Sequence, residues 1–526
     1  MSRSSNSKSA IESIIHSETA EKTYDRLKND RQQYIDRAVD CAKYTIPSIF
    51  PKEGSDGGTK FDTPYQSVGA RCVNNLANKL MLALFPPNSP FFRLSLSDKA
   101  QIDFKQAQEK QAEIEETLGQ FERTALNYME NKHLRVTLAE AMKHCVVVGN
   151  CLLFLPPTDE GGIKMYKLDH YTVQRDALGN VVQLITLDEI AFISLPEDLQ
   201  KVVIANSDSE VKPDEVVKVY THVYKGEDDN FYSYQEIKGV LVQGSESNYP
   251  CDSSPWIPVR MCKVDGEHYG RSLVEEYLGD FKTLENLSKA LTDLAALSSF
   301  ISFLVNPNGQ TRVSKLKNSK SGEFIPGRIE DINVLQIQKY NDMQVTKATI
   351  DDITMRLSYA FMLNSAVQRQ GERVTAEEIR YVARELEDTL GGIYSILSQE
   401  LQLPLVKRVL AQLQAVDKIP DLPADTIDLA ITTGLEALGR GQDLNKLSMF
   451  LEYAMQIPDV AQRINTENLL KRIATSLSLD TTGLVKTEEE LQQEMQQAQM
   501  QQMLQQATPA MAQGMVDANM PAEGQE

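Results

Sequence analysis

The sequence predicts a mixed α+β fold that is predominantly helical. Apolar residues recur at helical spacing over the first 150 residues and again from about residue 279, whereas residues 151–264 alternate with a period of two between turn-forming segments. Helices followed by a run of antiparallel strands are typical of an α+β body. Because a chain of 526 residues is too long for one hydrophobic core, we also expect several structural units.

Four helices are expected ahead of the strands, and prolines or a glycine mark the ends of three of them. Pro47 follows the first helix, Pro86 follows the second, and Gly149 ends the fourth. The four helices are expected at about residues 24–42, 68–84, 103–131 and 137–149. The strand region then contains two hairpin candidates, whose turns lie at residues 176–180 and 226–230.

Two later stretches share an alternation of three- and four-residue steps, which is typical of helices that pack in pairs. The first seam comprises Leu284, Leu287, Leu291, Leu294, Ser298 and Ile301. The second seam comprises Ile350, Ile353, Leu357, Ala360, Asn364 and Val367. Each seam corresponds to roughly 27 Å of α-helix. Since turn-rich sequence separates them, we expect an antiparallel helix pair that carries a small mixed module, about residues 303–345, at its far end.

A short basic loop follows the second seam and precedes a well-capped helix. The loop contains Gln368, Arg369, Gln370, Glu372 and Arg373. Thr375 and Glu378 form a capping box, and an apolar stripe runs from Ile379 to Ile393. The two arginines either pair with local carboxylates or contact DNA phosphates. One copy would be a weak DNA site, but phosphate contacts from many copies arranged in a ring would add up.

The C-terminal part predicts short helices and a polar tail. Residues 424–484 have the pattern of short amphipathic helices, and the sequence from Thr487 onward is a Gln/Met-rich helix former that ends in a Pro/Ala/Gly tail. Residues 486–526 contain one basic and seven acidic residues, a net charge of −6. This segment is therefore expected to avoid DNA phosphates.

The overall charge limits the function classes. With 54 basic and 74 acidic residues the net charge is −20, which argues against a protein that coats nucleic acid or an anionic membrane with its whole surface. The N-terminus lacks the apolar stretch of a signal peptide, and the longest apolar run is too short to cross a bilayer, so we expect a soluble, cytoplasmic protein. The six cysteines show no C-x-x-C pair and are expected to be reduced thiols.

Motifs for catalysis are absent from the sequence. It contains no phosphate-binding P-loop, no H-E-x-x-H, no G-x-S-x-G and no EF-hand loop, so we expect no catalytic residue, no metal and no cofactor. Asp265, Glu267 and His268 crowd together, but adjacent residues cannot all reach one ion, and we interpret them as a turn. Cys145 and Cys151 lie in an apolar segment and are interpreted as buried thiols.

One basic cluster falls in the inserted module. It comprises Arg312, Lys315, Lys317 and Lys320, with no acidic residue between them. The cluster is either an exposed loop or a surface on which a partner docks. Stacking on single-stranded nucleic acid is not supported, because no aromatic residue lies among these side chains.

The chain resembles the portal, or head–tail connector, proteins of short-tailed, podovirus-type bacteriophages. The resemblance runs in order over about residues 24–444. It is carried by "YTIPSIFP", "NNLANKLMLALFP", "VVVGNCLLFLP", "VQRDALGNV", "HYGRSLVEEYLGD", "LNSAVQRQGERVTAEEIRYVARELEDTLGGIYSILSQELQLPLV" and "GLEALGRGQDL".

The resemblance implies a ring of twelve subunits at one capsid vertex, with a channel through which double-stranded DNA is packaged and later ejected. It also implies a division of the chain into a wing, a stem of two helices, a clip, a tunnel loop with a long wing helix, a crown and a tail. The wing is expected at residues 1–278, the first stem helix at 279–302, the clip at 303–345 and the second stem helix at 346–367. The tunnel loop and long wing helix are expected at residues 368–418, the crown at 419–484 and the tail at 485–526. The loop with Arg369 and Arg373 falls where this family carries the tunnel loop.

The partners implied by the resemblance are other virion and packaging proteins. They are a transient terminase at the clip, tail adaptor and nozzle proteins, the major capsid protein, and scaffolding and internal core proteins. No membrane is involved, and the protein is expected in the virion and, during assembly, in the host cytoplasm. Two alternatives from other classes stay open at this point, a DNA-handling enzyme and a helical adaptor of lower oligomeric order.

Overall fold

The computed structural model describes residues 18–52, 54–55, 58–87, 90–96, 108–158, 161–207, 211–299, 302–309, 311–335, 340–363, 390–420, 427–431 and 451–452. The chain divides into two compact units, Met1–Ala100 with Phe121–Gly434, and Gln101–Gln120 with Leu435–Glu526. Within the second unit, the described residues are 108–120, which begin helix α5 (Gln108–Asn131), and residues 451–452. The first unit is described below.

The predicted N-terminal helices are confirmed as α2 (Ala20–Tyr44), α3 (Val68–Leu84), α5 and α6 (Leu134–Val148). The start of α2 is fixed twice, because the Thr19 hydroxyl accepts from the Lys22 N–H and the buried Glu236 carboxylate accepts from the Ala20 N–H at 2.7 Å. Helix α6 ends at Gly149, which has a φ of 82°. A Cβ there would lie 2.5 Å from the Arg271 carbonyl carbon, so both the backbone conformation and the close approach require glycine.

The largest sheet is antiparallel, with strand order β4-β5-β6-β7-β8 and β9 paired to β7. Its strands are β4 (Tyr171–Arg175), β5 (Val181–Ala191), β6 (Val216–Lys225), β7 (Asn230–Ile237), β8 (Val240–Leu241) and β9 (Ser247–Pro250). Both predicted hairpins are confirmed, β4–β5 with its turn at residues 176–180 and β6–β7 with its turn at residues 226–229. The Asp176 carboxylate closes the first turn by accepting from the N–H groups of Leu178 and Asn180.

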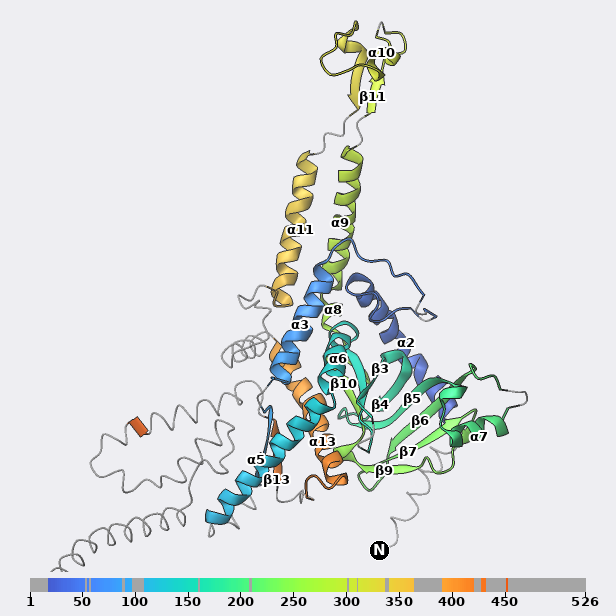
Figure 1. The fold of residues 1–526 in the computed structure, drawn as a ribbon, viewed down its shortest axis with the longest axis vertical. Coiled ribbons are helices and arrows are strands. Elements are labelled where there is room, and N and C mark those ends of the chain that lie inside the picture. Colours follow the sequence, from blue (N-terminus) through green and yellow to red (C-terminus); the bar gives the residue numbers. More distant parts are fainter. Residues whose placement is uncertain are drawn as a thin grey trace, which may run out of the picture. The chain divides into compact units, whose positions relative to one another are not determined.

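Helices cover both faces of this sheet. Tyr24 and Leu27 of α2 pack against Tyr220 and Tyr224 of β6. The period-two pattern did not predict helix α7 (Glu197–Ala205). This helix packs on the opposite face of the sheet, because the β6 residues that contact it alternate along the strand with those that contact α2. Figure 1 shows α2 and α7 beside β5, β6 and β7.

A second sheet of three strands has the order β10-β2-β3, all antiparallel. Its strands are β10 (Trp256–Arg260), β2 (Asn150–Phe154) and β3 (Lys164–Tyr166), and β2 follows α6 directly after Gly149. A two-stranded ladder pairs β1 (Phe92–Leu96) with β13 (Ile427–Ile431). The prediction of short helices from residue 424 is wrong for these five residues, because the alternating Ile-Asp-Leu-Ala-Ile sequence pairs as a strand with β1.

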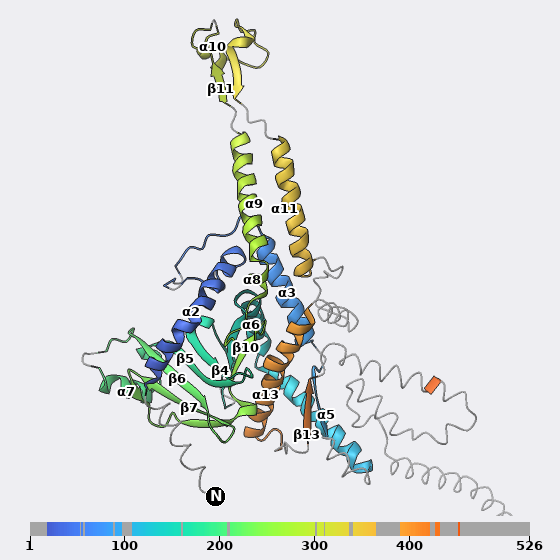
Figure 2. The same ribbon diagram turned by 180° about the vertical axis from the view of Figure 1, so that it is seen from behind.

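Two long helices, α9 (Leu278–Ser299) and α11 (Tyr340–Ala360), contact each other along the chain's predicted seams. They lie side by side and antiparallel in both views (Figures 1 and 2). The second helix begins before residue 346 and ends before the expected residue 367. It ends at Ala360 because the chain turns there, with Met362 at a φ of 56°. The seam positions Ile301, Asn364 and Val367 lie outside the described residues.

A small module connects the two long helices. It contains the antiparallel pair β11 (Ser302–Val305) and β12 (Ile332–Leu335) and the short helix α10 (Val313–Lys317). On the C-terminal side of the second long helix, the description resumes with helical residues 390–397, a π-helical turn (Ser398–Gln402) and α13 (Leu403–Ala415). The helix departs from regular α-helical geometry just before Pro404, because proline has no N–H to donate to the carbonyl four residues earlier.

Candidate assembly and docking sites

The two predicted seams face each other between α9 and α11. Leu284, Ile353 and Leu357 are buried; Leu284 belongs to the first two turns of α9, and the other two belong to the second half of α11. The remaining described seam residues are half-buried, namely Leu287, Leu291, Leu294, Ser298, Ile350 and Ala360. Residues off the seam are mostly exposed, so each helix turns one apolar face toward the other.

The inner end of α11 is fixed by hydrogen bonds to α3. Lys79 donates to the Met362 carbonyl at 2.8 Å, and Asn75 donates to the carbonyls of Phe361 and Met362, both at 3.0 Å. The Phe361 ring also meets the ring of Phe281 on α9, with centroids 5.6 Å apart. The chain is therefore held firmly up to Leu363. The predicted loop residues Gln368, Arg369, Gln370, Glu372 and Arg373 lie outside the described residues.

The inner end of α9 is fixed by a segment that crosses it. The N–H groups of Tyr65 and Gln66 donate to the Glu285 carboxylate at 3.0 and 3.3 Å, and the Lys289 ammonium lies over the Tyr65 ring at 5.8 Å. An ion pair between Lys282 and Asp40 at 3.1 Å ties the same helix to α2. These contacts tie residues 282–289 of α9 to residues 65–66 and to α2.

A buried ion pair joins the π-helical turn to β10. The Glu400 carboxylate accepts from the Arg260 guanidinium, with Nε at 3.1 Å, and from the Arg260 backbone N–H at 3.2 Å. The Arg260 side chain is 3% exposed and that of Glu400 19%. The neighbouring Arg175 is also buried, and burial together with the charge of Arg260 lowers its pKa to about 10. Glu400 therefore supplies one negative charge to a site that holds two guanidinium groups.

The inserted module is organised around a buried carboxylate. Asp331 accepts from the N–H and the hydroxyl of Thr311, at 3.2 and 2.9 Å. The Arg328 N–H in turn donates to the Thr311 hydroxyl at 3.0 Å, and Gly309 leaves room for the Asp331 side chain. The module is thus held by polar contacts more than by an apolar core.

The module exposes both apolar and basic side chains. Five large apolar side chains are more than half exposed, namely Phe303, Leu304, Val313, Phe324 and Ile329. The predicted basic residues are exposed as well, and in the part of the chain that the structure describes none of them makes an ion pair; they are Arg312, Lys315, Lys317 and Lys320. Lys315 and Lys317 belong to the last turn of α10.

The residues considered as metal ligands take part in structural contacts. Glu267 accepts from the Tyr34 hydroxyl at 2.9 Å and pairs with Arg271, and the His268 Nδ1 accepts from the Arg175 N–H at 3.1 Å. No group of three His, Cys, Asp or Glu residues within the described ranges could hold a metal ion. Asp265, Glu267 and His268 therefore form the predicted turn.

The cysteines of the apolar segment are buried. The sulfur atoms of Cys145 and Cys151 lie 3.4 Å apart, and this contact together with burial raises the pKa of the Cys145 thiol.

Helices of the described part of the chain that reach 18 residues all fall short of the apolar character needed to cross a membrane.

Sequence reasoning missed several of the anchoring residues. Glu236 at the start of α2, Lys79 below α11 and the Arg260–Glu400 pair are all charged side chains that contact partners far away in the chain. The only signal for Glu400 is that it interrupts an otherwise apolar helical segment just before Pro404.

A braced helix pair that carries a module with exposed apolar and basic side chains suits a protein that assembles with other proteins. Residues 17–485 match the family model described as "Bacteriophage head to tail connecting protein". The chain belongs to this family, and its function is that of a podovirus portal protein, which connects head and tail. The resemblance stated from the sequence is thereby confirmed.

The curated relatives are portal proteins. The chain is 50% identical to the portal protein of Escherichia phage T7 over 502 residues, which cover 94% of this chain and 93% of that protein. It is 52% identical to the portal protein of Enterobacteria phage T3 over 479 residues, covering 90% and 89% of the two chains. Among solved structures, a chain of the "Virion of native gene transfer agent (GTA) particle" aligns at 13% identity with a TM-score of 0.35, covering 73% of this chain and 85% of that one.

Proposed function

We propose that the chain assembles into a closed ring of twelve copies at one capsid vertex, and that double-stranded DNA passes through the ring during packaging and ejection. The observation that carries the proposal is the composition of the inserted module's surface. Five large apolar side chains stand more than half exposed in a module whose interior is held by Asp331 and Thr311. Exposed apolar surface of this kind marks a protein–protein contact, which neighbouring copies would cover.

The charge distribution fits a DNA conduit that does not bind its cargo tightly. Twelve copies of −20 give a ring of −240, and such a ring repels the DNA backbone except where basic residues are placed. The inserted module, residues 302–335, has five basic and three acidic residues and so carries +2 within this acidic chain. A local positive surface on an acidic ring suits docking of an acidic partner surface or transient contact with phosphates.

We assign the parts of the chain accordingly. Residues 1–278 form the wing, residues 279–302 and 346–367 the stem, and residues 303–345 the clip, except that residues 340–345 join the stem because α11 already begins at Tyr340 and ends at Ala360. Residues 368–418 contain the tunnel loop and the long wing helix, residues 419–484 form the crown, and residues 485–526 the tail. The packing of α9 against α11 supports the stem assignment, and the module between them supports the clip assignment.

The clip would dock other proteins in succession. A transient terminase would bind there during packaging, and tail adaptor and nozzle proteins would replace it. Capsid protein would surround the wing, and scaffolding and internal core proteins would join at this vertex during assembly in the host cytoplasm. In this scheme the chain is a passive conduit and not an enzyme, and needs no cofactor.

Native mass spectrometry of the purified protein tests the ring. The expected mass is near 708 kDa, twelve times the chain mass of 59.0 kDa. A Phe324→Ser, Ile329→Ser double variant should assemble less readily, because it removes two exposed apolar contacts, whereas Lys201→Ser on α7 serves as a matched surface control. A protein that stays monomeric even with scaffolding protein supplied would refute the ring.

Contact between the tunnel loop and DNA needs its own test. An Arg369→Ala, Arg373→Ala double variant should assemble with the normal mass and change the amount of DNA packaged or retained in the particle. Loss of the ring itself would contradict the assignment, because it would mean that these arginines support the fold.

A further inference from the structure

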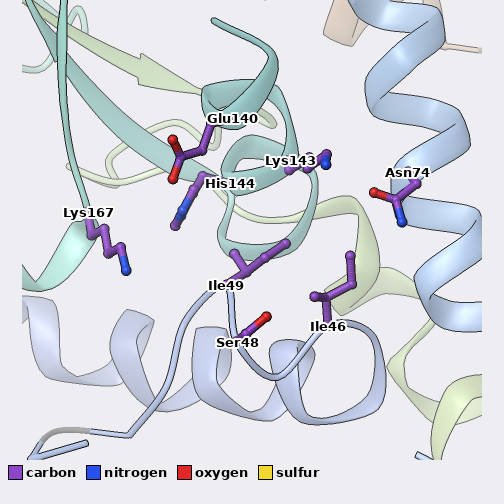
Figure 3. A pocket seen from close by; sticks show the side chains of 8 residues that line it. All are labelled: Ile46, Ser48, Ile49, Asn74, Glu140, Lys143, His144 and Lys167. Carbon is purple, nitrogen blue, oxygen red and sulfur yellow. The ribbon is translucent and has the colours of Figure 1, made fainter. Parts of the chain in front are cut away.

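A pocket of about 430 Å³ lies in the first unit, at a distance in the chain from both the inserted module and the tunnel loop. Residues that follow α2 form one wall, and α3, α6 and the segment after β3 form the others (Figure 3). Its volume falls in the range of sites for small organic ligands, roughly 300–1,000 Å³, and exceeds what one inorganic ion fills.

Two lysines approach the pocket from different elements. Lys143 belongs to α6 and Lys167 follows β3, and both side chains are half-buried. Neither ammonium group lies within 4.0 Å of a carboxylate oxygen of the described residues. Among the residues that line the pocket, Glu140 alone has a carboxylate, and Glu140 is exposed to solvent. The pocket therefore holds two partly desolvated positive charges that lack an ion-pair partner within the described chain.

A buried histidine adds an unpaired polar atom to the same pocket. His144 is 2% exposed, and its Nδ1 has no hydrogen-bond partner within the described ranges. Figure 3 shows its imidazole between Glu140 and Lys167. Such buried polar atoms are rare in folded proteins and costly when left unpaired, and one that lines a pocket marks a place for a ligand's polar group.

The other walls suit the body of an organic molecule. Ile46 and Ile49 supply apolar surface, and Asn74 on α3 supplies an amide that can donate or accept. An apolar wall with a few convergent polar groups is the usual composition of a small-molecule site.

We propose that this pocket binds a small organic anion. Its carboxylate or phosphate group would lie between Lys143 and Lys167, within reach of His144, and its body would pack on Ile46 and Ile49. The proposal is independent of the ring and of the DNA channel, because all of these residues belong to one unit of a single chain. A bound ligand would connect α6 to the segment that follows α2 and would stabilise the wing.

The test is thermal unfolding of the full-length protein with three probes, glutarate, adenosine monophosphate and inorganic phosphate. Sodium chloride keeps the ionic strength constant, so that general screening does not contribute. We expect a saturable rise in Tm of about 2 °C or more with at least one organic probe. A response to glutarate identifies a carboxylate ligand, and a response to adenosine monophosphate identifies a phosphate ligand.

Variants connect the response to the pocket. Lys143→Ala and Lys167→Ala should each raise the half-saturating concentration of the active probe by about tenfold, the loss of roughly one charge-assisted hydrogen bond. Lys347→Ala, at an exposed lysine of α11, is the matched control and should leave it unchanged. Circular dichroism checks that each variant is folded.

Three results would overturn the proposal. The first is the absence of a saturable response to either organic probe, and the second is saturation by inorganic phosphate alone, which would mean a simple ion site. The third is an unchanged half-saturating concentration in both Lys143→Ala and Lys167→Ala, as is expected for the control Lys347→Ala.

Discussion

Replacing Glu400 with alanine should strongly destabilise the first compact unit. The substitution leaves the Arg260 guanidinium, 3% exposed, without its carboxylate partner and close to the buried Arg175. Removal of one partner from a buried, hydrogen-bonded ion pair costs about 3–5 kcal/mol of the free energy of unfolding. The backbone N–H of Arg260 loses its acceptor as well, so we expect a value in the upper part of this range.

Urea titration followed by circular dichroism measures the effect, with variant and wild type compared in the same oligomeric state. Asp198→Ala is the control, because the Asp198–Lys201 pair on α7 is highly exposed and should cost no more than about 1 kcal/mol. Glu400→Gln should fall between the two, since its amide oxygen still accepts a hydrogen bond. If Glu400→Ala costs no more than Asp198→Ala, the pair does not hold the π-helical turn to β10 and the reasoning is wrong.

Three further predictions concern packing, pH and backbone. Leu291→Asp should lower Tm, because it places a charge at a half-buried seam position, whereas Thr292→Asp at an exposed position should not. Burial holds the pKa of His144 near 4 against about 6.5 when unfolded, so the folded state binds fewer protons between these values. This difference contributes about 3 kcal/mol to the free energy of unfolding above pH 6.5, and the contribution is lost as the pH falls toward 4. In urea titrations, the free energy of unfolding should therefore depend less steeply on pH in His144→Leu than in the wild type. Gly149→Ala should reduce soluble yield, whereas Gly119→Ala should not.

Local sequence patterns were sufficient to predict most helices and both hairpins. Helix ends at Pro47, Pro86 and Gly149 have direct physical causes within a few residues, and a period of two distinguishes strands without reference to distant contacts. The pairing of β1 with β13 was not predictable in this way, because its two strands are separated by more than 300 residues. Helix α7 was missed because it is a short insertion between strands.

The candidate sites also divide into those that local sequence patterns predict and those that depend on contacts between distant parts of the chain. The seams were readable because packing between two helices repeats every three or four residues, and the module's basic residues were readable as a cluster in the chain. The pocket around His144 was not, since Lys143 and Lys167 come to line the same pocket only after α6 and the segment following β3 have folded together. The Arg260–Glu400 pair spans 140 residues, so nothing near either residue reveals it.

The charges of the two long helices bear on how DNA could pass the ring. Each helix has two basic and three acidic residues, a net charge of −1. Two of these four basic groups already have ion-pair partners, since Arg356 pairs with Asp280 at 3.3 Å and Lys282 pairs with Asp40 at 3.1 Å. If these helices line the proposed channel, the surface that faces DNA has few basic side chains outside ion pairs and a slight excess of negative charge. Contact with phosphates would then depend on a few positions repeated around the ring, where single weak interactions multiply without requiring tight binding at any one subunit.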